Sequence, residues 1–182
     1  MQLKDADLIR KCVVYLGYRR PDGEAAIRGT GFLVDHNGAF FLVTARHNVI
    51  GAQRAGADGA LVSFNKKGVG KGHFKAAFSN WKMHPDPFTD VAVFPMRTEL
   101  AEYVMDVAAY PANNYVSEDT IRNMPITLGD EVFFPGLFHP YDSEDRNIPI
   151  VRTGTIAAMA DERVKTKWVD GTHAFIDAYL VE

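Results

Sequence analysis

The sequence has too few cysteines to build a metal centre, and its histidines are not spaced as metal ligands. Cys12 stands alone among 182 residues, so an intrachain disulfide and a cysteine-based zinc site are both excluded. No His-x-x-x-His pair occurs, and five histidines show no metal-ligand spacing: His36, His73, His84, His139 and His173. We therefore expect no metal and no cofactor, and a disulfide-stabilised secreted scaffold is not expected.

The chain also lacks a strong net charge and long apolar runs. The formal net charge is -3, from 20 basic and 23 acidic residues, and the basic residues are scattered along the chain, so no nucleic-acid partner is expected. No apolar run approaches the length of a membrane span, so no membrane partner is expected either. Met1 to Lys11 lacks the basic-then-apolar order of a secretory signal, which predicts a cytoplasmic or already processed protein.

What the chain does contain is a series of short apolar runs, rich in Val, Phe, Ile and Tyr and cut by Gly, Asn, Asp and Pro. Such runs predict an all-β protein. We expect strands at 12–16, 31–34, 39–43, 60–64, 73–78 and 91–94 and, after a connector, at 131–134, 148–158, 164–168 and 174–181. This layout predicts a first β-barrel in residues 1–100, and a connector with a partial second barrel in residues 101–182.

Turn and cap signals punctuate these runs. Asn37-Gly38 lies between two apolar runs and predicts a tight hairpin, because both residue types tolerate a positive φ. The Gly68-x-Gly-x-Gly72 pattern lacks the strand-to-helix setting of a dinucleotide loop and predicts another hairpin turn. Apolar residues at helical spacing predict a short helix over 99–107, and Ser117 reads as the cap of a helix that begins at Glu118. The acidic loop 139–147 is expected to be exposed.

Three segments carry candidate chemistry in chain order: Arg28 to Val34 (RGTGFLV), Leu42 to Val49 (LVTARHNV) and His84 to Val93 (HPDPFTDVAV). His47 follows a buried strand, and Asp90 opens an apolar run. A serine hydroxyl becomes a good nucleophile when an imidazole takes its proton, and a carboxylate fixes the tautomer of that imidazole. Taken singly, His47 suits a surface or capping position and Asp90 suits a turn. The order and spacing of the three segments together favour a catalytic role for these two residues.

In this order the segments resemble those of trypsin-like serine peptidases, most closely the disulfide-free bacterial members. The family shows Gly-Ser/Thr-Gly-Phe, then Thr-Ala-x-His, then Asp before an aliphatic-Ala-aliphatic run. The resemblance implies a chymotrypsin-like double antiparallel β-barrel whose second barrel is incomplete. It also implies that His47 is the general base, that Asp90 orients it, and that the substrate is a peptide or protein.

The resemblance continues in Gly129 to Gly136, in Thr153 to Ile156 and in Phe175 to Ala178, but no nucleophile follows. None of the serines stands in a Gly-x-Ser-Gly setting; they are Ser63, Ser79, Ser117 and Ser143. Where the family would continue into its nucleophile loop the chain ends, at Glu182, so we expect these 182 residues alone to be inactive.

Three functions remain open: a serine endopeptidase of which these residues are a fragment, a non-catalytic peptidase-like module that binds peptides or proteins, and an enzyme that a second polypeptide completes. The final run, 174–181, carries apolar side chains on both faces. If it forms an uncovered edge strand, self-association through this strand is expected.

Overall fold

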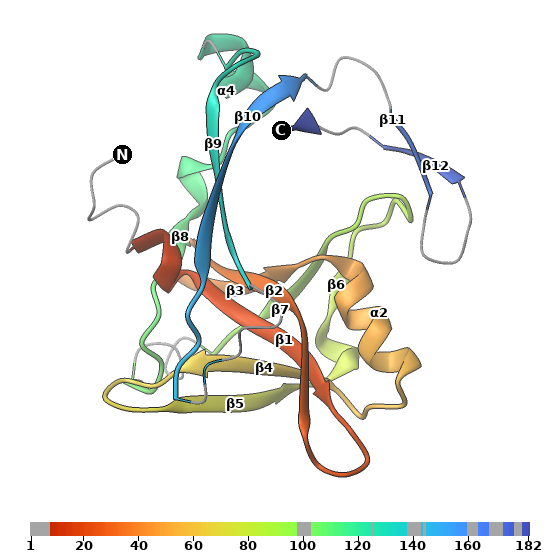
Figure 1. Ribbon diagram of the computed structural model, residues 1–182, viewed down its shortest axis with the longest axis vertical. Coiled ribbons are helices and arrows are strands. Elements are labelled where there is room, and N and C mark those ends of the chain that lie inside the picture. The colour runs from red at the N-terminus through yellow and green to blue at the C-terminus, as the bar shows by residue number, and fades with distance from the viewer. Residues whose placement is uncertain are drawn as a thin grey trace. The chain divides into compact units, whose positions relative to one another are not determined.

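The computed structural model describes residues 8–97, 103–124, 126–137, 143, 145–159, 164–167, 173–176 and 180–182 (Figure 1). These residues form mostly antiparallel β-sheet, which confirms the all-β prediction. No helix in this part of the chain is long and apolar enough to cross a membrane.

The described residues divide into two compact units that interleave along the sequence. The first unit draws on Met1–His84, Asp90–Asn114 and Pro135–Ile150, and the second on Pro85–Thr89, Tyr115–Phe134 and Val151–Glu182. A division into barrels at residue 100 stays a prediction.

The first unit contains one large sheet. Its strands are β1 (Val13–Arg19), β2 (Ala25–His36), β3 (Ala39–Thr44), β4 (Ala60–Asn65), β5 (Lys71–Ala76), β6 (Lys82–Met83), β7 (Ala92–Pro95) and β8 (Tyr110–Pro111). Their order is β5-β4-β1-β2-β3-β7-β6, and β8 pairs in parallel with β2. Helix α2 (Arg46–Arg54) follows β3, and single 3-10 turns lie at Phe78–Asn80 and Ala112–Asn114.

Alternating apolar residues of these strands form the core of the first unit. Val14, Leu33, Leu42 and Val62 are fully buried, each from a different strand. Strands β5 and β7 lie toward opposite ends of the strand order, yet the rings of Phe74 in β5 and Phe94 in β7 lie 6.2 Å apart. The sheet therefore curves until its two ends share one core.

Both predicted hairpin turns are confirmed. Asn37 and Gly38 adopt φ of 54° and 81° between the paired residues His36 and Ala39, and the Asp35 carboxylate accepts a hydrogen bond from the Gly38 N–H at 2.7 Å. The β4–β5 turn holds two more glycines at positive φ, and Asn65 pairs with Lys71 across it.

Two local predictions are wrong in part, in both cases because distant segments supply partners. Within the helix expected over 99–107, Tyr103 is helical, but Met105 forms a β-bridge with Lys66 and is fully buried; residues 98–102 lie outside the described part. The loop 139–147 is not uniformly exposed, because Asn147 is 4% exposed and hydrogen-bonded to β4.

The second unit holds smaller sheets. β9 (Glu131–Gly136), which begins in this unit, β10 (Ile150–Ala158) and β13 (Leu180–Val181) form a three-stranded sheet, and β11 (Val164–Lys167) pairs with β12 (His173–Ile176). Helix α4 (Glu118–Asn123) begins at the predicted cap, since the Ser117 hydroxyl accepts a hydrogen bond from the Thr120 N–H at 3.1 Å.

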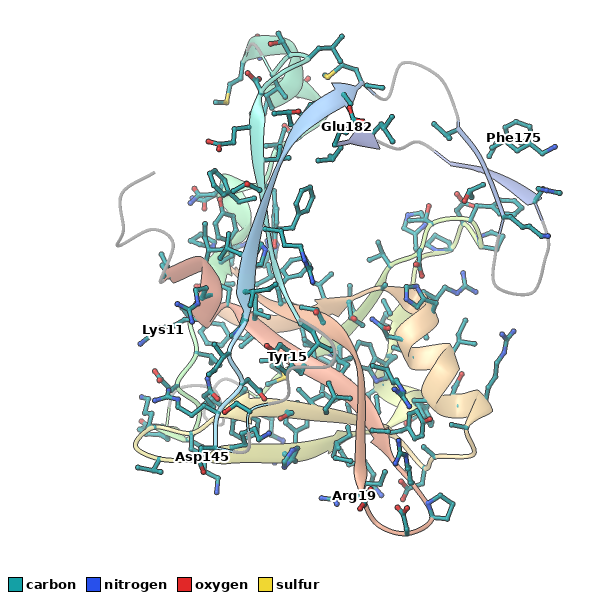
Figure 2. The ribbon with its side chains drawn as sticks, viewed as in Figure 1. Lys11, Tyr15, Arg19, Asp145, Phe175 and Glu182 are labelled. Atoms are coloured by element: carbon teal, nitrogen blue, oxygen red, sulfur yellow. The ribbon has the colours of Figure 1, made fainter. Side chains whose placement is uncertain are left out.

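The run 174–181 is not one strand. Its first part belongs to β12, which pairs with β11, while Leu180 and Val181 pair with β10; residues 177–179 lie outside the described part. Phe175 projects from the β11–β12 hairpin and is 57% exposed (Figure 2). Among the described residues of the second unit, Ile156 is the one buried hydrophobic side chain.

Candidate active site

Strand pairing explains why His47 and Asp90 meet although 43 positions separate them. β3 and β7 are antiparallel, and Thr44 at the end of β3 pairs with Ala92 at the start of β7. The chain leaves β3 into α2 beside the point where Asp90 enters β7, and the Arg46 N–H donates to the Asp90 carbonyl at 3.3 Å.

The Asp90 carboxylate contacts His47 at two points. Oδ1 accepts a hydrogen bond from the His47 backbone N–H at 2.9 Å, and Oδ2 lies 2.6 Å from Nδ1 of the ring. With the proton on Nδ1, this arrangement fixes both the tautomer and the plane of the imidazole and leaves Nε2 as the basic nitrogen. The His47 side chain is 60% exposed and that of Asp90 29% exposed. The contact expected from the sequence is present.

Asp90 also caps helix α2 from outside the helix. The residue before the helix, Ala45, offers no side-chain cap, and the first turn contains no acidic residue. A carboxylate that accepts a hydrogen bond from an N–H of the first turn does the work of a cap and opposes the positive end of the helix dipole. One carboxylate therefore starts the helix and orients the ring that the helix carries.

Polar contacts behind the histidine fix the first turn of α2 to the sheet. The buried Thr44 hydroxyl donates to the Thr30 carbonyl at 2.8 Å and accepts from Asn48 Nδ2 at 3.1 Å. A Cβ atom at Gly29 would overlap the Asn48 amide. The sequence signalled the glycine but not Asn48, because its role depends on a strand that precedes it by 19 positions.

Thr30 of the first motif has a structural role. Thr30 Oγ1 accepts a hydrogen bond from the Leu137 N–H at 3.0 Å, next to Gly136, so the Gly136 end of β9 lies against the Gly29–Gly31 stretch.

In the described part of the chain, no serine occupies the position of a nucleophile, because no hydrogen bond joins a serine to His47. Ser63 is 1% exposed and bonds to Asn147, and Ser117 caps α4. The Ser79 hydroxyl lies 3.4 Å from Asn80, and the Ser143 carbonyl accepts from Lys71.

No metal site is formed by the described residues, which contain no group of three ligating side chains. A surface depression of about 380 Å³ lies at the β2–β3 turn and is lined in part by Asp35, His36 and Asn113. It includes neither His47 nor Asp90.

Comparison with protein-family models finds no family that matches this chain, and comparison with curated proteins finds no matching relative.

Proposed function

We propose that this chain carries the histidine and aspartate of a trypsin-like serine endopeptidase, within a chymotrypsin-like double β-barrel whose second barrel is incomplete. The observation that carries the proposal is the two-point contact between Asp90 and His47. The order of the three motifs and the curved antiparallel sheet also support it.

In the proposed reaction, Nε2 of His47 takes the proton of a serine hydroxyl as the serine oxygen attacks the peptide carbonyl. His47 then gives that proton to the leaving amine, and Asp90 stays ionised and stabilises the imidazolium. The 182 residues contain no serine in a Gly-x-Ser-Gly setting, so the nucleophile has to come from polypeptide outside them. We propose that the chain alone does not hydrolyse peptides.

The test begins with the nucleotide sequence that follows the codon for Glu182. If it encodes an in-frame Gly-x-Ser-Gly, the extended polypeptide should cleave peptides and be labelled by a fluorophosphonate. Asp90→Asn should then lower kcat by about 10⁴-fold, because the wrong tautomer is stabilised. Asp58→Asn is the matched control, since Asp58 is an exposed aspartate that pairs with Lys75. An active extended protein that tolerates His47→Ala would refute the proposal.

The second candidate is a non-catalytic module that binds peptides or proteins. The capping contact of Asp90 favours it, because this contact gives the aspartate a reason to be present without catalysis. If no Gly-x-Ser-Gly follows, calorimetric titration with unstructured peptides should show binding without cleavage, and His47→Ala should leave that binding intact.

We also propose self-association through the region 174–181, where Phe175 and Leu180 are both more than half exposed. Sedimentation velocity across a concentration series should show a dimer or a larger species, and Phe175→Ser should shift the distribution toward monomer. A monomer at every concentration would refute this proposal.

A further inference from the structure

Asn48, which follows His47 directly in α2, joins the first turn of the helix to the end of β3. Its Nδ2 donates a hydrogen bond to the Thr44 hydroxyl at 3.1 Å, and that hydroxyl donates in turn to the Thr30 carbonyl at 2.8 Å. A hydroxyl has a single proton, so with this proton on Thr30 the Thr44 oxygen can only accept from Asn48. Thr44 is 4% exposed, so water competes little for the contact.

The Asn48 amide also lies directly against the backbone of Gly29. A Cβ atom at Gly29 would overlap Cγ, Nδ2 and Oδ1 of the amide. The amide is therefore confined between β2 and the Thr44 hydroxyl. A confined side chain fixes the backbone of the residue that carries it, and the neighbour of that residue in the helix is His47.

Thr44 connects this contact with the aspartate as well. Its backbone pairs with Ala92 across β3 and β7. Asp90, two residues before Ala92, accepts from the His47 backbone and lies 2.6 Å from the ring. These contacts close a cycle that consists of Thr44, Ala92, Asp90, His47 and Asn48. The position of the ring relative to the carboxylate is therefore set from two sides.

Apolar packing of α2 does not supply this restraint. Val49 and Ala52 are buried and hold the helix on the core, but apolar contacts are not directional. A rotation of about 20° about the helix axis, at a Cα radius of about 2.3 Å, moves each Cα atom by about 0.8 Å and the ring by more. Such a displacement would stretch the 2.6 Å contact between the His47 ring and Asp90 beyond hydrogen-bonding distance.

We propose that Asn48 is a positioning residue that acts through Thr44 to keep Nδ1 of the His47 ring on Asp90 and Nε2 free to take a proton. The role rests on the proposed peptidase function, in which a displacement of about 1 Å lowers the rate by about 100-fold. The Thr-Ala-x-His motif ends at His47, so Asn48 lies outside the segments that carry the family resemblance.

The first experiment follows the His47 ring in the 182-residue chain by proton–nitrogen NMR spectroscopy, which requires no nucleophile. The Nδ1 proton in the short contact with Asp90 should give a downfield resonance, and Asp90→Asn should remove this resonance and so assign it. Asn48→Ala should speed the exchange of this proton with water by about tenfold, as expected when one hydrogen bond that holds the ring is lost. Gln53→Ala removes an exposed amide side chain from the same helix. It is the matched control and should leave the resonance unchanged.

Thr44→Val approaches the same contact from the other side. Valine keeps the branched shape of threonine but lacks the hydroxyl that Asn48 contacts. It should speed the exchange of the His47 ring proton, and most of this effect should be absent when Asn48 is already alanine, because the ring senses the hydroxyl through Asn48. Circular dichroism shows whether each variant is folded, and Thr44→Val carries the test if Asn48→Ala is not. Unchanged exchange in a folded Asn48→Ala, or full additivity of the two effects, would overturn the proposal.

A second measurement applies if the extended polypeptide cleaves peptides. Asn48→Ala should then lower kcat by about 10- to 100-fold and leave KM within about twofold, because the ring and not the substrate is displaced. Gln53→Ala should change neither constant. Full kcat in Asn48→Ala would overturn the positioning role while the peptidase function stands. If the extended polypeptide is inactive, the peptidase function fails, and the NMR comparison still decides whether Asn48 holds the ring.

Discussion

Asn147→Ala offers the sharpest test of how the segment after β9 is attached to strand β4 within the first unit. The Asn147 side chain donates from Nδ2 to the Ser63 carbonyl at 2.8 Å and accepts from the Ser63 hydroxyl at 3.2 Å, with both residues buried. The backbone of Asn147 makes two further bonds to the Asn65 side chain, and these do not depend on the Asn147 side chain.

The expected loss follows from this count. Two buried hydrogen bonds contribute about 0.5–1.5 kcal/mol each, and the Ser63 carbonyl left without its partner adds about 1 kcal/mol or more. Asn147→Ala should therefore lower the free energy of unfolding by about 2–4 kcal/mol. Ser63→Ala removes one of the same bonds and should cost about 1 kcal/mol, with most of that cost absent when Asn147 is already alanine.

Urea denaturation measures both values. Tryptophan fluorescence in a Trp168→Phe background reports on Trp81, which belongs to the same core as β4. Asn113→Ala, at an exposed asparagine, is the control and should change stability by less than about 0.5 kcal/mol. A comparably small change for Asn147→Ala, or full additivity with Ser63→Ala, would refute the attachment.

Three further outcomes follow from single contacts. The hydrogen bond from Lys11 is the main cause that lowers the pKa of Asp106. The ionised carboxylate therefore contributes stability above the unfolded pKa near 3.9, and this contribution is lost as pH falls through the folded pKa. The urea midpoint of Asp106→Asn should fall less between pH 7 and pH 3 than that of the parent. Gly29→Ala should destabilise the fold by about 1–3 kcal/mol in the same denaturation assay, because the new methyl group displaces the Asn48 amide. Burial raises the pKa of the Cys12 thiol to about 11, so Ellman's reagent at pH 8 should label Cys12 slowly until urea unfolds the chain, and rapid labelling of the folded protein would contradict its burial.

The features that could be predicted from the sequence are mainly those that neighbouring residues determine. The Asn37-Gly38 turn depends on the backbone freedom of two adjacent residues, and the Ser117 cap on one hydroxyl three residues from its partner. The contact of His47 with Asp90 is long-range, and it could be predicted because a known family provides a template for the spacing.

The features that could not be predicted depend on partners distant in sequence. Met105 lies within a stretch whose other apolar residues recur at helical spacing, but the bridge to Lys66 and burial in the core override that local preference. Asn147 lies in an acidic stretch that suggests exposure. It is buried because Ser63 and Asn65 of β4, which lie 84 and 82 positions earlier, are its hydrogen-bond partners. No local property of an asparagine reveals such partners.

The Asp90 carboxylate both caps helix α2 and orients the ring of His47, so evolution constrains residues 47 and 90 differently. Helix α2 needs an acceptor at position 90, whereas at position 47 the cap uses only a backbone N–H that any residue except proline provides. If the proposed peptidase function holds, then in a descendant chain released from selection for catalysis, folding alone would still retain an acceptor such as aspartate or asparagine at position 90, and the imidazole would be free to drift. The residue at position 47 is therefore the more sensitive record of past or present catalysis among homologues, and an aspartate at position 90 by itself records only the start of a helix.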